Sequence, residues 1–175
     1  KTQTESFDVV FEAINLVGRC TDTKDEANQL VTEMKNRIKA VTDKTDKLPE
    51  SERPGVLYIV WHDPIFAIGG GTLGNTLIEA AGGVNIFQEQ IGAPIVDLET
   101  IIARNPQVIL GSAAVGAGAD LPYQFALNEE RLKVVDARIN NRVYGVNDDL
   151  TGRPGPRIVE ALELLAEIIH PELFK

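Results

Sequence analysis

A chain of 175 residues is long enough to bury one sizeable core and too short for two full-sized domains. The chain has 17 Lys and Arg against 26 Asp and Glu, and the formal net charge of -9 opposes binding to nucleic acid or anionic lipid, so no nucleic-acid partner is expected. The single cysteine, Cys20, excludes an internal disulfide framework and any metal site built from several thiolates.

The N-terminal part of the chain predicts two helices. Apolar residues recur at helical spacing from Phe7 to Val17, with an end near Gly18, and again along one stripe from about Lys24 to Thr42. The second helix would span about 30 Å, which is typical of helices that bridge two structural units. The first residues lack the pattern of a signal peptide. The chain opens on Lys1 without an initiator methionine, so we expect it to be a processed or trimmed chain.

After a polar linker at residues 43–54, the chain alternates strands and helices. Apolar runs predict buried strands at 56–61, 107–111 and 143–147. Amphipathic stretches predict helices at 73–81, 98–104 and 158–169. Thr72 and Asp97 are the predicted N-caps of the first two. This alternation predicts an α/β fold, a Rossmann-like lobe with a mostly parallel sheet flanked by helices.

Residues at the carboxyl ends of these strands are candidates for ligand binding, because open α/β sheets bind their ligands there. One is the loop at 112–120, which is mostly glycine and alanine. Trp61 ends the first predicted strand, His62 and Phe66 follow it, and Arg153 follows the third. Aromatic faces with one guanidinium suit a large, flat or anionic organic ligand. A core Trp beside a surface Arg explains the same spacing equally well, so both interpretations stay open.

Gly69, Gly71 and Gly74 match the G-x-G-x-x-G pattern of dinucleotide-binding domains. Glu89 lies near the distance expected for a ribose-binding carboxylate, but the glycines do not follow the first strand directly. A tight turn into a capped helix explains the same glycines. A dinucleotide-binding domain of an oxidoreductase is therefore the alternative function.

No residues stand out as carriers of catalysis or as a metal site. His62 and His170 are the only histidines and lie far apart in the chain, and no nucleophile motif occurs. We therefore predict no resident metal, no cofactor and no enzymatic activity.

Four segments resemble, in their order and spacing, the substrate-binding proteins of ABC importers for cobalamin, haem and iron chelates. They are GTLGNTLIEAAGGVN at 71–85, VDLETIIARNPQ at 96–107, NNRVY at 140–144 and RPGPRIVEAL at 153–162. The resemblance implies two Rossmann-like lobes joined by one long helix, with the ligand clamped between them. It implies that residues 1–22 are a short helical remnant of the junction with a missing N-terminal lobe, 23–45 the interlobe helix, and 54–175 the C-terminal ligand-binding lobe.

Carried over by position, the resemblance places Trp61 and Phe66 against the ligand and Arg153 in the cleft. His62, next to Trp61, completes the predicted ligand-binding set. Glu99 corresponds to the carboxylate that docks onto arginines of the membrane permease, although a first-turn carboxylate is also stabilised locally by the helix dipole.

The resemblance implies capture of a metal chelate, such as cobalamin, haem or a ferric siderophore, and its delivery to an ABC permease. It implies a periplasmic or extracellular location, with a membrane anchor in the full-length protein. An interlobe helix without one of its lobes would expose its apolar stripe, so self-association through this helix is a further expectation.

Overall fold

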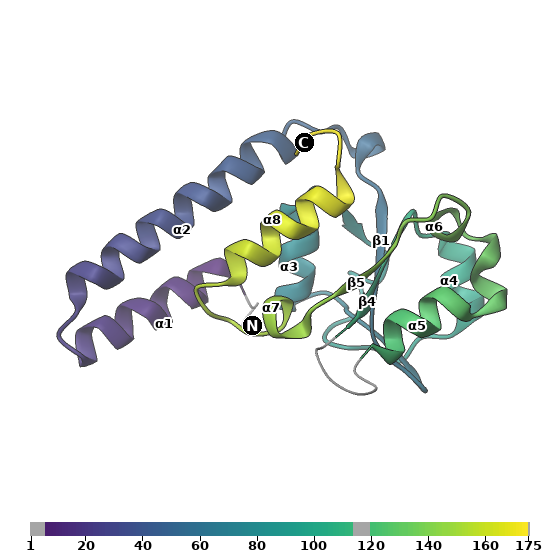
Figure 1. Ribbon diagram of the computed structural model, residues 1–175, viewed down its shortest axis with the longest axis horizontal. Helices are drawn as coiled ribbons and strands as arrows, with labels where there is room; N and C mark the ends of the chain where they lie inside the picture. Colours follow the sequence, from purple (N-terminus) through teal and green to yellow (C-terminus); the bar gives the residue numbers. More distant parts are fainter. Residues whose placement is uncertain (1–5, 114–119, 175) are drawn as a thin grey trace.

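The structure, a computed structural model, describes residues 6–113 and 120–174 and contains a mostly parallel sheet with helices on both faces (Figure 1). The strands are β1 (Gly55–His62), β2 (Ile65–Ala67), β3 (Val84–Asn85), β4 (Val108–Ser112) and β5 (Val143–Val146). The α-helices are α1 (Phe7–Cys20), α2 (Lys24–Thr45), α3 (Leu73–Ala80), α4 (Leu98–Arg104), α5 (Leu121–Asn128), α6 (Asp136–Ile139), α7 (Asp148–Thr151) and α8 (Ile158–Ile169). Short 3₁₀ helices occupy Glu50–Glu52 and Glu130–Val134. The predicted α/β class is confirmed.

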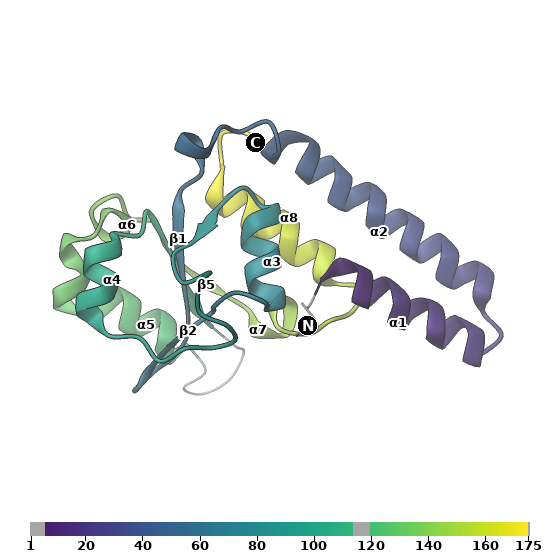
Figure 2. The same ribbon diagram turned by 180° about the vertical axis from the view of Figure 1, so that it is seen from behind.

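The strand order is β2-β1-β4-β5, and β3 pairs separately with β1. β1 runs parallel to β3 and β4, β4 runs parallel to β5, and β2 pairs with β1 in the antiparallel sense. The carboxyl ends of β1, β4 and β5 therefore meet at one edge of the sheet. The same edge carries α7 and the turn between β1 and β2, at the bottom of both views (Figures 1 and 2). Residues 114–119 of the predicted glycine- and alanine-rich loop lie outside the described residues.

The sheet divides the core into two layers. On one face α3 and α8 pack over Tyr58 and Leu110, and on the other α4, α5 and α6 pack over Ile59 and Ile109 (Figure 1). These four side chains are at most 2% exposed, which confirms that the central strands are buried on both faces.

α1 and α2 form an antiparallel pair that extends away from the lobe, as both views show (Figures 1 and 2). α2 packs against α1 and α8, and these contacts bury Val31, Met34 and Val41. The expectation of an exposed apolar stripe on the long helix is therefore wrong. The large apolar side chains of this pair that are exposed, Leu16 and Val17, lie on α1.

α1 continues past Gly18 to Cys20, although glycine was expected to end it. Gly18 is buried against α2, and a β-carbon there would meet Ala27 and the Thr23 carbonyl oxygen. The glycine thus permits the close approach of the two helices and does not terminate the first.

Pro64 and the three glycines at 69–71 flank β2, and such residues are typical of a loop. β2 becomes a strand because its partners supply hydrogen bonds: Phe66 stands opposite Trp61 of β1, and Phe66 also bridges to Ile95. Such pairing is non-local and leaves no periodicity in a three-residue segment.

Candidate functional site

The structure brings three of the four predicted ligand-binding residues together at the carboxyl edge. Trp61 and Phe66 are cross-strand neighbours, and the rings of Trp61 and His62 lie 5.3 Å apart. The indole Nε1 donates a hydrogen bond to the carbonyl oxygen of Asp63 at 2.9 Å. Trp61 remains 47% exposed, so a fixed apolar face is available to a ligand.

Phe125 of α5 joins this group, because its ring lies 6.1 Å from that of His62. The sequence carried no signal for this contact, since α5 has only a weak helical pattern. A cavity of about 390 Å³ opens beside the rings and is lined by His62, Asp63, Pro64, Ile65, Leu98, Phe125 and Arg131. Among the described residues, nothing forms a hydrogen bond with the buried Nδ1 of His62.

The basic group at this cavity is already paired. Arg131 donates from its side chain to both carboxylate oxygens of Glu129, at 2.9 and 3.1 Å. These bonds, with a further one from the Arg131 backbone N–H, lower the pKa of Glu129 to about 2. Both side chains are therefore charged at neutral pH, and the carboxylate of Glu129 balances the positive charge of Arg131.

Arg153, the fourth predicted residue, stands apart from the aromatic group. It lies between α7 and α8 and forms an exposed ion pair with Asp149, at 2.6 Å. No ring contact joins Arg153 to Trp61 or Phe66 in the part of the chain that the structure describes. The structure thus places Arg153 near the carboxyl end of β5 but not against the aromatic faces.

A polar network lies beneath the edge on the α3 side. The hydroxyl of Tyr58 donates to Asp148 Oδ1 at 3.1 Å and lies 2.7 Å from Thr151 Oγ1. A cavity of about 240 Å³ opens above these groups and is lined by Tyr58, Val60, Ile68, Thr72, Leu73, Gly74, Asp148, Thr151 and Gly152. Ser112, the last residue of β4, is 1% exposed. Its hydroxyl lies close enough to the Tyr58 phenol to lower the pKa of that phenol. It has no hydrogen-bond partner at normal distance and angle among the described residues.

Burial, followed by the negative charge of Asp148, raises the pKa of Tyr58 well above its ordinary value. The unfolded chain loses this proton near pH 10, whereas the folded protein keeps it. The stability that the neutral phenol provides is therefore complete below about pH 10 and falls above it, by up to about 1.4 kcal/mol per pH unit.

The Tyr58→Phe variant is expected to lose this alkaline dependence. It should cost about 1 kcal/mol at pH 8, because Asp148 loses a donor, and the difference from the wild type should shrink as the pH rises above 10. Urea unfolding of both proteins between pH 8 and 11.5 measures the difference. If the difference in unfolding free energy between the two proteins stays constant over this pH range, the pKa of Tyr58 is not raised by folding.

The glycine segment at 69–74 does not form a phosphate cradle in this fold. The N–H groups of Gly69 and Gly70 donate to the carbonyl oxygens of Gly92 and Gln90, at 2.8 and 2.7 Å. Glu89, the candidate ribose ligand, is paired with Arg104 at 2.6 Å. Dinucleotide sites need free backbone N–H groups and a free carboxylate, so this geometry disfavours the alternative function.

Thr72 and Asp97 cap α3 and α4 as predicted. Thr72 accepts from the N–H of Asn75 at 3.1 Å, and Asp97 accepts from the N–H of Thr100 at 2.7 Å. Glu99 follows Asp97 in the first turn of α4, and its side chain is exposed. It is accessible to a partner and also lies where the helix dipole stabilises a carboxylate, so both of its predicted roles remain compatible with the structure.

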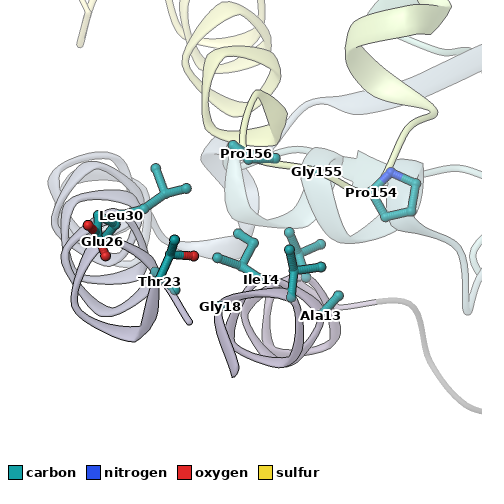
Figure 3. A pocket seen from close by; sticks show the side chains of 12 residues that line it. Ala13, Ile14, Gly18, Thr23, Glu26, Leu30, Pro154, Gly155 and Pro156 are labelled. Carbon is teal, nitrogen blue, oxygen red and sulfur yellow. The ribbon is translucent and has the colours of Figure 1, made fainter. Parts of the chain in front are cut away.

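The groove of about 450 Å³ between α1, α2 and residues 154–156 is larger than the two cavities at the sheet edge (Figure 3). Ala13 and Ile14 of α1, Leu30 of α2 and Pro156 lie around it (Figure 3). Its lining is almost entirely apolar and helical, which is typical of a surface that meets another protein segment.

Within the described ranges, no cluster of three or more His, Cys, Asp or Glu side chains is arranged to hold a metal ion. The helices of those ranges also lack the combination of length and apolarity that a bilayer-crossing helix needs.

Comparison with known proteins identifies relatives over nearly the whole chain. The chain is 31% identical over 172 residues to an uncharacterized ABC transporter substrate-binding lipoprotein, YvrC, of Bacillus subtilis, covering 98% of this chain and 53% of the relative. It is 27% identical over 168 residues to a cobalamin-binding protein of Halobacterium salinarum, covering 94% of this chain and 45% of that protein. The chain thus spans about half the length of these curated relatives.

The fold also matches solved structures. A protein of Staphylococcus epidermidis, described as a possible iron-binding, periplasmic solute-binding protein, superposes with a TM-score of 0.80 at 27% identity, covering 95% of this chain and 63% of that chain. The family model described as periplasmic binding protein matches residues 2–150. On the strength of that match, which spans most of its length, the chain belongs to the periplasmic binding protein family.

Proposed function

We propose that this chain forms part of an ABC transporter substrate-binding protein that captures a metal chelate, such as cobalamin, haem or a ferric siderophore, for a membrane permease. The observation that carries the proposal is the aromatic group at the carboxyl edge, where a half-exposed Trp61 is held beside His62 and Phe66. The family is one of binding proteins, which are not enzymes, and two relatives are named for substrate binding and cobalamin binding.

Family membership implies an extracytoplasmic location. We propose a membrane anchor for the full-length protein as well, because the Bacillus subtilis relative is a lipoprotein.

The second half of the ligand cleft would come from residues outside this chain. The resemblance to substrate-binding proteins of ABC importers assigns these residues to an N-terminal lobe. Two observations support this proposal. The curated relatives are about twice as long as the chain, and the apolar groove between α1, α2 and residues 154–156 offers a surface for a further segment (Figure 3). The division at residues 1–22, 23–45 and 54–175 stays a prediction.

A chelate titration tests the function. Trp61 is the only tryptophan of the chain, and it lies in the candidate site, so a bound chelate should quench its fluorescence. Cyanocobalamin, haemin and ferrioxamine B would be titrated into this chain and into the complete product of its gene. We expect at least one of them to bind the complete product, with weaker binding to this chain. If none of the three binds the complete product at micromolar concentration, the proposed function is wrong.

Glu99→Gln tests the proposed contact with the permease. Removal of a docking carboxylate is expected to leave chelate affinity unchanged and to lower chelate uptake by cells about tenfold or more, because charged contacts at an interface are costly to unpair. Glu167→Gln, on the exposed side of α8, removes the same charge elsewhere. Equal uptake with both variants would assign Glu99 a purely local role.

A further inference from the structure

The small cavity on the α3 side of the carboxyl edge combines apolar walls with one carboxylate. It has a volume of about 240 Å³ and lies between β1, the start of α3 and α7 (Figure 1). Val60, Ile68 and Leu73 form apolar walls, and Asp148 is the one charged side chain among the described residues that line it. Sites for whole organic ligands begin at roughly 300 Å³. The cavity therefore has room for one side arm of a ligand and excludes a macrocycle.

The carboxylate of Asp148 lacks a cationic partner. Its residue is half buried, and no cation of the described residues lies within 4.0 Å of its oxygens. The guanidinium of Arg153, further along the same loop, is bound to Asp149 at 2.6 Å. The side-chain hydrogen bond that Asp148 accepts comes from the neutral hydroxyl of Tyr58, at 3.1 Å to Oδ1. A negative charge that is partly removed from water and unpaired favours the binding of a cation.

The hydroxyl groups beside this carboxylate have no further proton to donate to it. Thr151 Oγ1 lies 2.7 Å from Tyr58 Oη and 3.2 Å from the carbonyl oxygen of Asn147. Tyr58 and Thr151 are each 2% exposed, and each hydroxyl has a single proton for these contacts. Among the described residues, Oδ2 of Asp148 accepts no hydrogen bond, whereas an ionised carboxylate accepts about four. The cavity therefore lacks a hydrogen-bond donor at its charged end.

A primary ammonium group on a short alkyl chain fits these features better than other cations. Its three N–H donors match the unused acceptor positions of the carboxylate, and its methylene groups match the apolar walls. A guanidinium pairs with both carboxylate oxygens at once, and Oδ1 is already bound to Tyr58. A metal ion needs several ligands, and no group of three or more His, Cys, Asp or Glu side chains surrounds Asp148 in the part of the chain that the structure describes.

We propose that this cavity binds a primary ammonium group on a short alkyl chain, with Asp148 as its counter-ion, and that it is the subsite for an aminoalkyl arm of the captured chelate. The assignment to a chelate arm rests on the proposed function. Val60, which lines the cavity, directly precedes Trp61 on β1, so the cavity adjoins the aromatic surface proposed for the body of the chelate. The subsite selects chelates that carry such an arm over chelates in which the same arm is uncharged.

A free amine tests the cavity without a chelate. n-Pentylamine, which is protonated at neutral pH, would be titrated into the isotope-labelled complete product of the gene, with 1-pentanol as the neutral counterpart. We expect saturable NMR shifts of the backbone N–H groups of Val60, Thr72 and Gly152 with the amine, and affinity for the alcohol at least about tenfold lower. If the amine gives no saturable shift at these residues, or the alcohol binds as well, the ammonium site is wrong.

Asp148→Asn isolates the charge, because asparagine keeps the shape of the side chain and an oxygen that accepts from Tyr58. It is expected to lower the affinity for n-pentylamine about tenfold or more. The matched control is Asp46→Asn, which removes an exposed carboxylate after α2, a helix that ends at the top of Figure 1, away from the carboxyl edge. The control should bind the amine as the wild type does. Equal affinity of the Asp148→Asn variant and the control would overturn the role of Asp148.

A pair of chelates tests the side arm. Ferrioxamine B carries an aminoalkyl arm, and its N-acetyl derivative carries the same iron and the same iron-binding groups without the charge. We expect the complete product to bind ferrioxamine B at least about tenfold more tightly, and Asp148→Asn to remove this difference.

The outcomes separate the site from the function. If both chelates bind equally while n-pentylamine occupies the cavity, the cavity binds free amines and the assignment to a chelate arm is wrong, while the proposed function stands. If no chelate binds the complete product, the proposed function and the chelate arm are wrong together, and the amine titration alone decides the ammonium site.

Discussion

Replacing Gly70 with alanine is expected to destabilise the protein by about 3 kcal/mol or more. Gly70 is buried in the segment that leads from β2 into α3, and its backbone runs beside residues 88–92. Its N–H donates to Gln90 and its carbonyl accepts from the N–H of Gly92, at 2.7 and 3.0 Å. A β-carbon at Gly70 would collide with the carbonyl oxygen of Gln88. Neither backbone can yield without losing these bonds.

Thermal unfolding and urea titration measure this effect. For a chain of this size, a loss of that magnitude lowers Tm by on the order of 10 °C. Gly155→Ala is the matched control, because an added β-carbon there meets nothing within 4 Å. If the Gly70→Ala protein is as stable as the control, the backbone around Gly70 and the backbone at residues 88–92 can move apart without loss of stability.

Replacing Trp61 with alanine is expected to weaken chelate binding about 30-fold or more, which corresponds to the loss of a binding hot spot of about 2 kcal/mol. The indole is half exposed, so its removal should cost the fold little. Its orientation is set before the ligand arrives by the hydrogen bond from Nε1 to Asp63 and by the neighbouring His62 ring. Such preorganisation concentrates binding energy in one side chain.

Equilibrium dialysis or the absorbance of the chelate must report this binding, because the variant lacks the only tryptophan of the chain. Trp61→Phe keeps an aromatic face but loses the Nε1 hydrogen bond, so its affinity should fall only a few-fold. If the alanine variant binds chelate as tightly as the phenylalanine variant, the aromatic group is not the ligand surface.

The elements that local signals define were predictable. The caps Thr72 and Asp97 and the apolar periodicity placed α3, α4 and α8 within about a residue of their observed bounds, because a side chain that accepts from a backbone N–H acts over one helical turn. β2 was missed because its hydrogen-bond partners lie in β1 and around Ile95, and a three-residue segment has no pattern of its own.

The candidate site was predictable in part. Trp61, His62 and Phe66 were predicted to lie together because they stand at or just after the end of a buried strand, and the structure brings them together at the carboxyl edge. Their role in ligand binding stays a prediction. Phe125 was not found, since only tertiary packing brings α5 to that edge. Arg153 was found by position, but its pairing with Asp149 emerged only from the folded loop after α7.

The sequence by itself determined the α/β class, the helix caps and the kinship with binding proteins, because these rest on periodicity and motif order. Tertiary structure alone decided three further points. The N–H groups of Gly69 and Gly70 donate to carbonyl oxygens of residues 90–92, the apolar stripe of α2 is covered by α1 and α8, and the charge of Arg153 is paired with that of Asp149. Each depends on which distant or loop-borne groups meet in space, and local residue preferences do not encode that.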